Sequence, residues 1–306
     1  MSDIKCLSKN KKLSVQALTK YISSNLGNSE LLLKCADPAA RFSNVSEFMV
    51  KSAEDNAYFV REMINQIITT EALKGENLDA ACKINSAVCE NYARMKNLSV
   101  LCSADRLKRT MTYISAAQYA REFFKSVNES LPLEMCRNIC LNAALDKEVY
   151  CKVNTQYLTQ ILLNFLINAI IHGHTDNNRV DIAVSRVPNS AYAEISVIDY
   201  GVGIDINRLR KIMNRKSSGC NNGNLILASY RGYGLIVCQI LAEALGAKIL
   251  VSNVERGGAA FILLLKCTDK PDRPGHMRLA DPRPALGFRE DRMIRLSLAQ
   301  FDKWED

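Results

Sequence analysis

The sequence predicts an α+β fold: an N-terminal helical hairpin followed by a two-layer α/β sandwich with a mixed, mostly antiparallel sheet. Two observations predict the hairpin and one predicts the sandwich. Apolar residues recur at helical spacing over 45–73 and again over 78–107, with a short turn at Lys74-Gly75 between them. From residue 179 onward, short β-rich runs alternate with turns and a helical pattern. A chain of 306 residues is long enough to bury a substantial core.

Composition excludes several classes of protein. The net charge is +8, but aromatic residues make up only 7% and Trp304 is the single tryptophan, which argues against base-stacking platforms for nucleic acid. No apolar run is long enough to cross a membrane, and Met1–Ser14 has no signal-peptide core. We therefore expect a cytoplasmic protein without a membrane span and without a nucleic-acid partner.

Cysteine and histidine usage argues against a metal centre. The 11 cysteines are scattered without a CxxC pair, and the whole chain has only 3 histidines. In a reducing compartment such cysteines are typical free thiols, several of them in the core.

The N-terminal half is predicted to be helical. After a Lys-rich segment at 1–12, helical patterns run over 13–33, 45–73 and 78–107. Two long helices joined by a short turn pack antiparallel, and continuous apolar seams favour a second copy that completes a four-helix bundle. The predicted seam includes Val60, Ile64 and Ile67. The alternative is an intramolecular bundle with the 13–33 helix.

The second half is predicted to place one layer of helices on one sheet. Expected helices lie at 114–127, 154–171 and 235–245, and expected strands at 135–141, 149–153, 179–187, 192–199, 248–252 and 259–265. Proline and charge dominate 268–292, which predicts a linker or disordered tail, with a short helix at 293–301.

Polar residues on the 154–171 helix point to a site. Asn164, Asn168 and His172 fall four apart, and asparagine is a mediocre helix former that is costly to bury unpaired. Taken alone, the pair fits core-edge asparagines equally well. Two later segments favour a site: Asp199-Tyr-Gly201-Val-Gly203 ends a predicted strand, and Arg231-Gly232-Tyr-Gly234-Leu235 opens a predicted helix.

With these three motifs, residues 148–266 resemble the ATP-binding domain of sensor histidine kinases, in the superfamily shared with gyrase, the ninety-kilodalton heat-shock chaperones and mismatch-repair ATPases. The asparagines match the N box, and the glycine pairs match the two glycine boxes. The resemblance implies ATP and Mg²⁺ as ligands and the following binding residues: Asn164, Asn168, His172, Asp199, Gly201, Gly203, Lys216, Arg231, Gly232, Tyr233, Gly234 and Leu235. Together with the composition of the two ends, it gives the expected domain order: a flexible 1–12, a dimerisation or phosphotransfer-like region at 13–110, the ATP-binding domain at 111–267 and a Pro- and charge-rich tail at 268–306.

Each motif has a physical role. Asp199 can accept a hydrogen bond from the exocyclic amine of adenine, and the glycines after it let the backbone turn beside the base. Asn168 offers an amide oxygen to Mg²⁺, and Asn164 orients that shell. Gly232 and Gly234 lie where a helix begins, so backbone N–H groups can hold phosphate oxygens.

The segment between the glycine boxes is the expected ATP lid. It spans 28 residues and includes a glycine- and asparagine-rich run at 216–224, flanked by candidate phosphate-binding cations such as Arg215. Two departures from the family affect phosphate contacts: residues 209–213 lack the lid's usual phenylalanine, and Ile171 stands where many such kinases carry lysine.

The motifs also discriminate within the superfamily. ATPases and serine-directed anti-sigma kinases carry glutamate at the position of Asn164, and an amide cannot take up a proton. Histidine kinases carry a phosphoacceptor histidine on the hairpin, but no histidine precedes His172 here; the two registers place that position near Asn56 or at Ser24. The resulting hypothesis is a dimeric protein of the histidine kinase type that binds Mg-ATP without conventional autophosphorylation.

Such a pseudokinase would work with a response regulator or a partner kinase. If the protein is instead catalytically active, we expect an ATP-dependent protein kinase, a transferase of two-component signal transduction. The alternative is a non-catalytic scaffold or phosphotransfer partner with a degenerate pocket.

Overall fold

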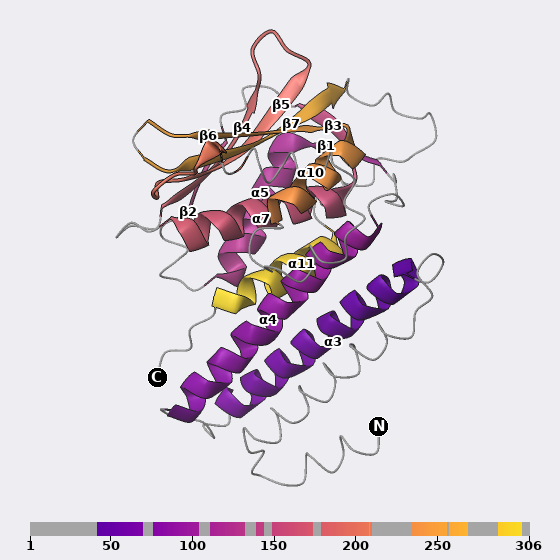
Figure 1. Cartoon of the computed structure of the whole chain (residues 1–306), viewed down its shortest axis with the longest axis vertical. Helices are drawn as coiled ribbons and strands as arrows, with labels where there is room; N and C mark the ends of the chain where they lie inside the picture. Colours follow the sequence, from indigo (N-terminus) through magenta and orange to yellow (C-terminus); the bar gives the residue numbers. More distant parts are fainter. Residues whose placement is uncertain are drawn as a thin grey trace. The chain divides into compact units, whose positions relative to one another are not determined.

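The computed structural model describes residues 42–69, 76–103, 111–131, 139–143, 149–173, 179–207, 209, 234–255, 257–268 and 287–301. Contacts divide the chain into two compact units, shown in Figure 1. One unit comprises Met1–Ser103 with Ala299–Asp306, and the other comprises Ala104–Leu298.

The first unit contains the predicted helical hairpin. Helix α3 (Phe42–Thr69) and helix α4 (Glu76–Ser103) form two long arms. Val60 and Ile64 on α3 are fully buried and cluster with Ala81 on α4, with Ile84 and Val88 packed against them. The expected hairpin is therefore confirmed, and two of the residues predicted to face a second copy are covered within this chain. The 13–33 pattern and the Ile67 side chain lie outside the described residues.

A short C-terminal segment completes this unit. The 3₁₀ turn η3 (Ala299–Phe301) packs on α4. Asn85, which is fully buried, donates its amide N–H to the Ala299 carbonyl at 3.2 Å. The Ser86 hydroxyl donates to the Gln300 carbonyl at 2.6 Å. These side chains satisfy the carbonyls of the first two residues of the turn.

The second unit is built on a seven-stranded sheet. Its strands are β1 (Thr112–Ser115), β2 (Ile139–Ala143), β3 (Tyr150–Val153), β4 (Val180–Arg186), β5 (Tyr192–Asp199), β6 (Lys248–Asn253) and β7 (Ala259–Thr268). The order is β1-β3-β7-β5-β4-β2, with β6 also paired to β7. The β2–β4 pair is parallel and the other described pairs are antiparallel. The mixed, mostly antiparallel sheet is as predicted.

Helices cover one face of this sheet (Figure 1). They are α5 (Ala116–Ser130), α7 (Thr155–His172) and α10 (Gly234–Leu245). Helix α11 (Phe288–Leu298) lies against α5 and α7. The rings of Phe165 on α7 and Phe261 on β7 stack with centroids 5.4 Å apart, which joins the two layers at the centre of the core. The two-layer α/β sandwich is confirmed.

Two elements differ from the expected bounds near the start of α5. Residues 112–115 form β1, although the predicted helix began at Ile114. β-Branched and aromatic side chains favour a strand there, and Ile114 pairs with Cys151 of β3. Ser115 then caps the helix, because its hydroxyl accepts from Gln118 N at 3.4 Å. Of the strand expected at 135–141, the first four residues lie outside the described residues, and the described strand is Ile139–Ala143.

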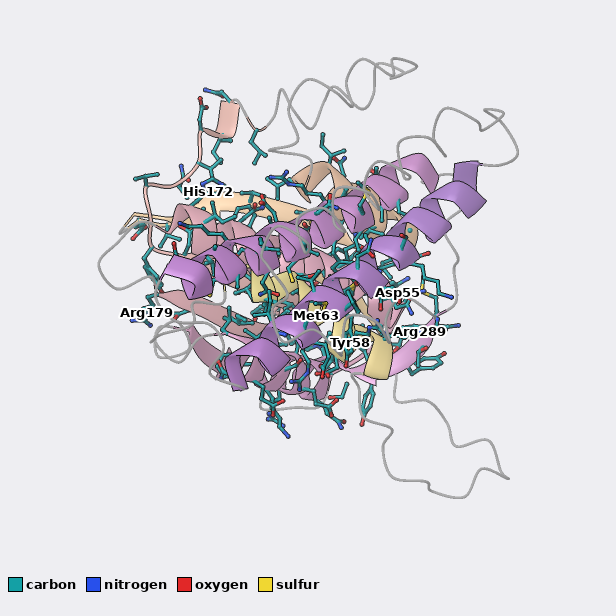
Figure 2. All side chains as sticks on the ribbon, turned by 90° about the horizontal axis from the view of Figure 1, so that it is seen from below. Asp55, Tyr58, Met63, His172, Arg179 and Arg289 are labelled. Atoms are coloured by element: carbon teal, nitrogen blue, oxygen red, sulfur yellow. The ribbon has the colours of Figure 1, made fainter. Side chains whose placement is uncertain are left out.

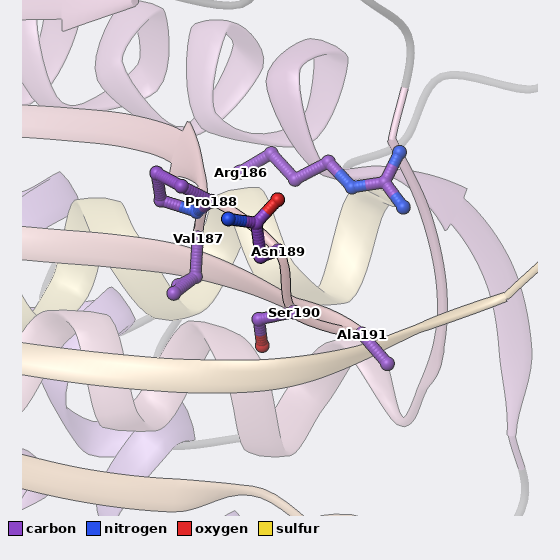
Figure 3. Close-up of a pocket in the computed structure, with 6 residues that line it drawn as sticks. All are labelled: Arg186, Val187, Pro188, Asn189, Ser190 and Ala191. Atoms are coloured by element: carbon purple, nitrogen blue, oxygen red, sulfur yellow. The ribbon is translucent and has the colours of Figure 1, made fainter.

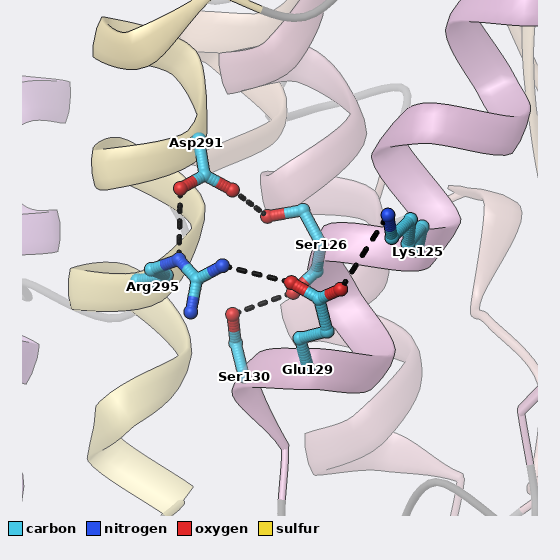
Figure 4. A network of polar contacts seen from close by, with 6 residues as sticks. All are labelled: Lys125, Ser126, Glu129, Ser130, Asp291 and Arg295. Atoms are coloured by element: carbon cyan, nitrogen blue, oxygen red, sulfur yellow. Dashed lines mark hydrogen bonds and ion pairs between the residues drawn. The ribbon is translucent and has the colours of Figure 1, made fainter.

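Helix α11 begins at Phe288, five residues before the predicted helix, and packs on α5 and α7. Met293, Ile294, Leu296 and Leu298 are buried. Figure 4 shows the polar contacts with α5: Ser126 donates to Asp291 at 2.6 Å, and Arg295 pairs with Asp291 and Glu129, each at 2.8 Å.

A further hydrogen bond ties α11 to the first residue of α7, because Thr155 donates to Glu290 at 2.6 Å. Its buried apolar residues and these polar contacts together hold α11 against α5 and α7.

Candidate nucleotide-binding site

Helix α7 carries three polar residues that become more exposed toward its C-terminal end. The Asn154 side chain caps the helix by accepting from Tyr157 N at 3.1 Å. Asn164 is 8% exposed, Asn168 is half-buried, and His172 is exposed at the last position (Figure 2). The face predicted to be polar therefore runs from the core to the surface.

Asp199 ends β5 with its carboxylate held by the backbone. The residue is 3% exposed, and Oδ1 accepts hydrogen bonds from Gly201 N at 3.0 Å and Ala259 N at 3.2 Å. Within the described residues, no donor reaches Oδ2. One oxygen thus fixes the orientation of the carboxylate, and the other retains its capacity to accept a hydrogen bond.

Three glycines pack against Asp199 and the end of α7. A Cβ on Gly201 would lie 2.4 Å from the His172 carbonyl oxygen, and one on Gly173 would lie 2.5 Å from the Ala169 oxygen. Gly258 has φ +96°, and a Cβ there would lie 2.0 Å from the backbone carbonyl oxygen of Asp199. Backbone approaches this close exclude any side chain. The first glycine box is therefore pressed directly onto the C-terminal end of α7.

The loop after Asp199 is held by a residue from another strand. Gly203 has φ +78°. Asn253 of β6 accepts from Ile204 N at 2.8 Å and donates to Ile204 O at 3.0 Å, so one side chain satisfies both backbone groups of Ile204. Val202, at the turn, is 87% exposed. The Asn253 side chain thus ties the turn to β6, while Val202 points outward.

The second glycine box meets α7 at Asn164. Gly234 is the first residue of α10, and a Cβ there would lie 3.2 Å from the Asn164 Oδ1 atom. Cys238, one turn further on, is fully buried, and its thiol contacts the Ile161 carbonyl at 3.8 Å. Burial raises the pKa of the Cys238 thiol, and a hydrogen bond to Asn164 opposes that shift. Asn164 is thereby held between α7 and α10.

Asn168 differs from Asn164 in its surroundings. Its side chain is half-buried one turn closer to the surface, and it makes no polar contact with any described residue. An amide oxygen in that position retains its capacity to ligate a hard cation.

Three residues brace the outer side of the Asp199 turn. Arg179 pairs with Asp181 through Nε at 2.9 Å and Nη2 at 2.8 Å, and the Tyr200 hydroxyl donates to Asp181 at 2.7 Å. The Arg179 guanidinium also lies 5.1 Å from the Tyr200 ring centroid. Burial opposes ionisation, but the hydrogen bonds from Arg179 and Tyr200 lower the pKa of Asp181. This ion-paired cluster fixes the residue that directly follows Asp199.

The structure thus brings together the N box, the first glycine box and the start of α10. The lid segment 216–224 lies outside the described residues, as do the predicted site residues Lys216, Arg231, Gly232 and Tyr233; Leu235 is half-buried in the first turn of α10. Among the described residues, no cluster of three metal-ligating side chains is present. Likewise, none of the described helices is long and apolar enough to span a membrane.

Sequence reasoning missed Gly173, Tyr200, Asn253 and Gly258 as parts of this site. The Gly257-Gly258 pair lies between the strands expected at 248–252 and 259–265. Its position directly before a strand that follows the glycine boxes was the available signal.

A surface hollow at the other end of the β4–β5 hairpin is separate from this site. It is lined by Arg186–Ala191, all from a single turn (Figure 3). Because Val180 pairs with Asp199 and Arg186 pairs with Ala193, this turn lies at the opposite end of the hairpin from the Asp199 carboxylate.

Comparison with known proteins agrees with this geometry. Residues 153–269 match the family described as histidine kinase-, DNA gyrase B-, and HSP90-like ATPase. No match was found among curated proteins. Full-length ShkA in complex with AMPPNP is similar with a TM-score of 0.52 and 16% identity, over 78% of this chain and 48% of ShkA. The present chain therefore spans about half the length of that protein.

Two further solved structures are similar at lower scores. The histidine kinase AdeS of Acinetobacter baumannii has a TM-score of 0.45 and 16% identity, over 69% of this chain and 94% of AdeS. The nucleotide-free catalytic domain of the histidine kinase ThkA has a TM-score of 0.39 and 23% identity, over 51% of this chain and 96% of that domain.

The match over 153–269 coincides with α7, β4, β5, α10, β6 and β7, which carry every described residue of the site. Residues 153–269 are therefore similar to the histidine kinase-, DNA gyrase B-, and HSP90-like ATPase family, and the described part of the candidate site lies within the matched range.

Proposed function

We propose that this chain is a histidine-kinase-like protein of two-component signal transduction that binds Mg-ATP and does not autophosphorylate on its own hairpin. The observation that carries the proposal is the Asp199 carboxylate, whose Oδ1 is held by two backbone N–H groups while Oδ2 is left for a ligand. An acceptor-only oxygen matches the N6 amine of adenine, whereas guanine offers a carbonyl oxygen at the same position.

The remaining groups suit the phosphates and their cation. The half-buried Asn168 amide fits Mg²⁺, because it makes no polar contact with the described residues and supplies a hard oxygen ligand. The ion would neutralise phosphate charge when bound. Asn164, one helical turn before Asn168 and more deeply buried, packs against Gly234 and the Cys238 thiol and so orients this part of the site. The start of α10 then offers backbone N–H groups to phosphate oxygens.

The acceptor for the γ-phosphoryl group lies outside this chain. Neither α3 nor α4 contains a histidine, and Asn56, the position expected from one register, is half-buried on α3. An amide nitrogen has no usable lone pair, whereas imidazole is a good nucleophile near neutral pH. Ser24, the other register, is outside the described residues. We therefore place the acceptor on a response regulator or on a partner kinase.

Dimerisation through the hairpin is part of the proposal. Because Val60 and Ile64 are covered within this chain, the interface is assigned to the exposed side of α3, where Tyr58 is 53% exposed (Figure 2). Met63, half-buried on the same helix, adds a second apolar group.

A scaffold with a degenerate pocket is the second candidate function. Ile171 favours it, because an apolar side chain, 44% exposed, stands where many such kinases carry a cation.

Titration calorimetry with Mg-ATP and Mg-GTP tests nucleotide binding. The parent should bind Mg-ATP in preference to Mg-GTP, and Asn168→Ala should weaken binding in the presence of Mg²⁺. Asp199→Asn should also weaken binding. Its matched control is Asp55→Asn, the same substitution at an exposed position of α3, which should bind Mg-ATP like the parent. Equal binding by all variants would rule out the assigned site.

Phosphotransfer is tested with γ-labelled ATP, first with the protein alone and then with candidate response regulators. We expect no acid-labile, base-stable phosphate on the chain itself. Robust labelling of the unmodified protein would contradict the proposal, and mass spectrometry would then locate the phosphate on His172, His174 or His276. Absence of any nucleotide binding would favour the scaffold.

A further inference from the structure

Two cysteines face each other across the β3–β7 pair. Cys151 on β3 lies directly opposite Cys267 on β7 in the antiparallel register. The backbone N–H of Cys267 donates to Ala191 O at 2.7 Å, on the β5 side of the strand. Both backbone polar groups of a strand residue point to the same edge, so Cys267 presents no hydrogen-bonding group toward β3. The cysteines therefore occupy a non-hydrogen-bonded pair, the closer of the two antiparallel types.

This type of pair meets the geometric requirements of a disulfide. Cα atoms in such pairs lie about 4.5 Å apart, and a disulfide accepts Cα separations of about 4.4–6.8 Å. Each thiol is also close enough to the other to influence its pKa. Closing the bond therefore requires rotation of two side chains and no change of strand register.

The two thiols differ in access to solvent. Cys151 is fully buried, whereas Cys267 is partly exposed. Burial and the neighbouring Cys267 raise the pKa of the Cys151 thiol to about 12. Burial also raises the pKa of Cys267, but the positive charge of Arg186 opposes that shift. A soluble oxidant thus meets Cys267 first, while Cys151 is held as the second sulfur.

We propose that Cys151 and Cys267 form an oxidisable dithiol site that closes to a cross-strand disulfide in the presence of a peroxide. The Cys267 sulfur attacks hydrogen peroxide, the O–O bond breaks, and the products are a sulfenic acid and one water molecule. The Cys151 sulfur then attacks the Cys267 sulfur, the S–O bond breaks, and the released hydroxide leaves as water with the Cys151 proton. Two thiols are oxidised, one peroxide is reduced, and two waters form.

The disulfide would reinforce the shortest described junction in the sheet. The β3–β7 ladder pairs two residues, whereas β5 and β7 pair along seven. A covalent bond there ties the β1–β3 arm to the central strand. The two cysteines are also remote from the candidate nucleotide-binding site. Cys267 lies near the end of β7, whereas Ala259, which contacts Asp199, is the first residue of that strand. Oxidation should therefore change stability without changing ATP affinity.

The experiment uses the full chain treated with hydrogen peroxide, followed by alkylation of remaining thiols and peptide mapping without reductant. We expect a linked peptide containing Cys151 and Cys267, restoration by dithiothreitol, and a rise of about 5 °C in the thermal unfolding midpoint of the oxidised protein. Cys151→Ser and Cys267→Ser should abolish both effects. Cys82→Ser, on α4, is the matched control and should retain them.

Either of two results would overturn the inference: both thiols remain alkylatable after peroxide treatment, or Cys267 links to a different cysteine. Mapping of the parent decides between these outcomes even if a serine variant fails to fold. Calorimetry with Mg-ATP before and after oxidation separates this site from the proposed function, since affinity should stay within about twofold.

Discussion

The helical hairpin depends on side-chain volume, whereas the nucleotide end of the sheet depends on backbone contacts. On α3 and α4 the core is a stripe of aliphatic residues, Val60 and Ile64 against Ala81. Around Asp199, glycines lie where a Cβ would meet backbone oxygens, and a carboxylate binds two N–H groups directly. Many apolar sequences satisfy the first requirement, but few satisfy the second. Chemical constraint is therefore concentrated around the Asp199 turn, while the described part of the hairpin carries packing and no imidazole.

The largest expected effect comes from filling the closest backbone contact. Gly258 has φ +96°, and Gly258→Ala places a Cβ 2.0 Å from the backbone carbonyl oxygen of Asp199. The turn must therefore move, and Mg-ATP binding should be lost. The destabilisation should exceed about 4 kcal/mol. Gly246→Ala is the control: its φ is +66° but no atom lies within 4 Å, so about 1–2 kcal/mol of strain is expected with normal binding. Denaturant unfolding and calorimetry measure both, and equal effects would refute the backbone argument.

A charge in the hairpin core tests the volume side of the comparison. Val60→Glu buries a carboxylate beside Ile64 and Ala81 and should destabilise the helical unit by about 3–5 kcal/mol. Tyr58→Glu, at an exposed position of the same helix, should cost little stability but dissociate the proposed dimer. Circular dichroism and light scattering separate the two effects. A parent that is monomeric at micromolar concentration would remove the dimer proposal and favour the intramolecular bundle.

A smaller effect is expected from exchanging one atom of the carboxylate. Asp199→Asn keeps Oδ1 for Gly201 and Ala259 but turns the second oxygen into a donor facing the adenine amine. ATP binding should weaken at least tenfold, about 1.4 kcal/mol, with little loss of stability. If calorimetry finds unchanged affinity, Asp199 does not read the base.

The smallest effect should come from the brace beside the turn and should depend on pH. Tyr200→Phe removes the hydroxyl that donates to Asp181, which costs about 1 kcal/mol at neutral pH. Because the folded pKa of Asp181 is lowered, the carboxylate's contribution is present above its ordinary pKa and is lost as pH falls through the folded value. The difference between parent and variant should therefore shrink in acid. A difference that is constant from neutral pH down to acid unfolding would show that Asp181 ionisation is not involved.

Local patterns predicted the elements but not all of their partners. Periodicity identified α3, α4 and α7, and the alternating pattern before Asp199 placed the first glycine box at the end of a strand, as β5 has it. The same periodicity cannot tell an intrachain seam from an interchain one, which is why Val60 and Ile64 were assigned to a second copy. Apolar spacing also extended the predicted α5 helix over Ile114, because β1 depends on a ladder with β3 that no local window contains.

The missed site residues share one cause. Ala259 lies 60 positions from Asp199, and Asn253 lies 49 positions from Ile204. These contacts arise from the register of β5, β6 and β7, which is set by the packed sheet. Gly258 owes its role to the same register. Such residues become recognisable only when the strand pairing is known.

The placement of α11 has a consequence for how the chain leaves the ribosome. Its partners Ser126 and Thr155 are synthesised 165 and 135 positions before Asp291 and Glu290, so the apolar surface of α5 and α7 waits for a helix made much later in the chain. At about 5–20 residues per second, that interval lasts seconds, during which the nascent domain exposes the side chains that α11 later buries. A stop codon before Phe288 would leave that surface open permanently, and quality control would meet it as unfinished protein.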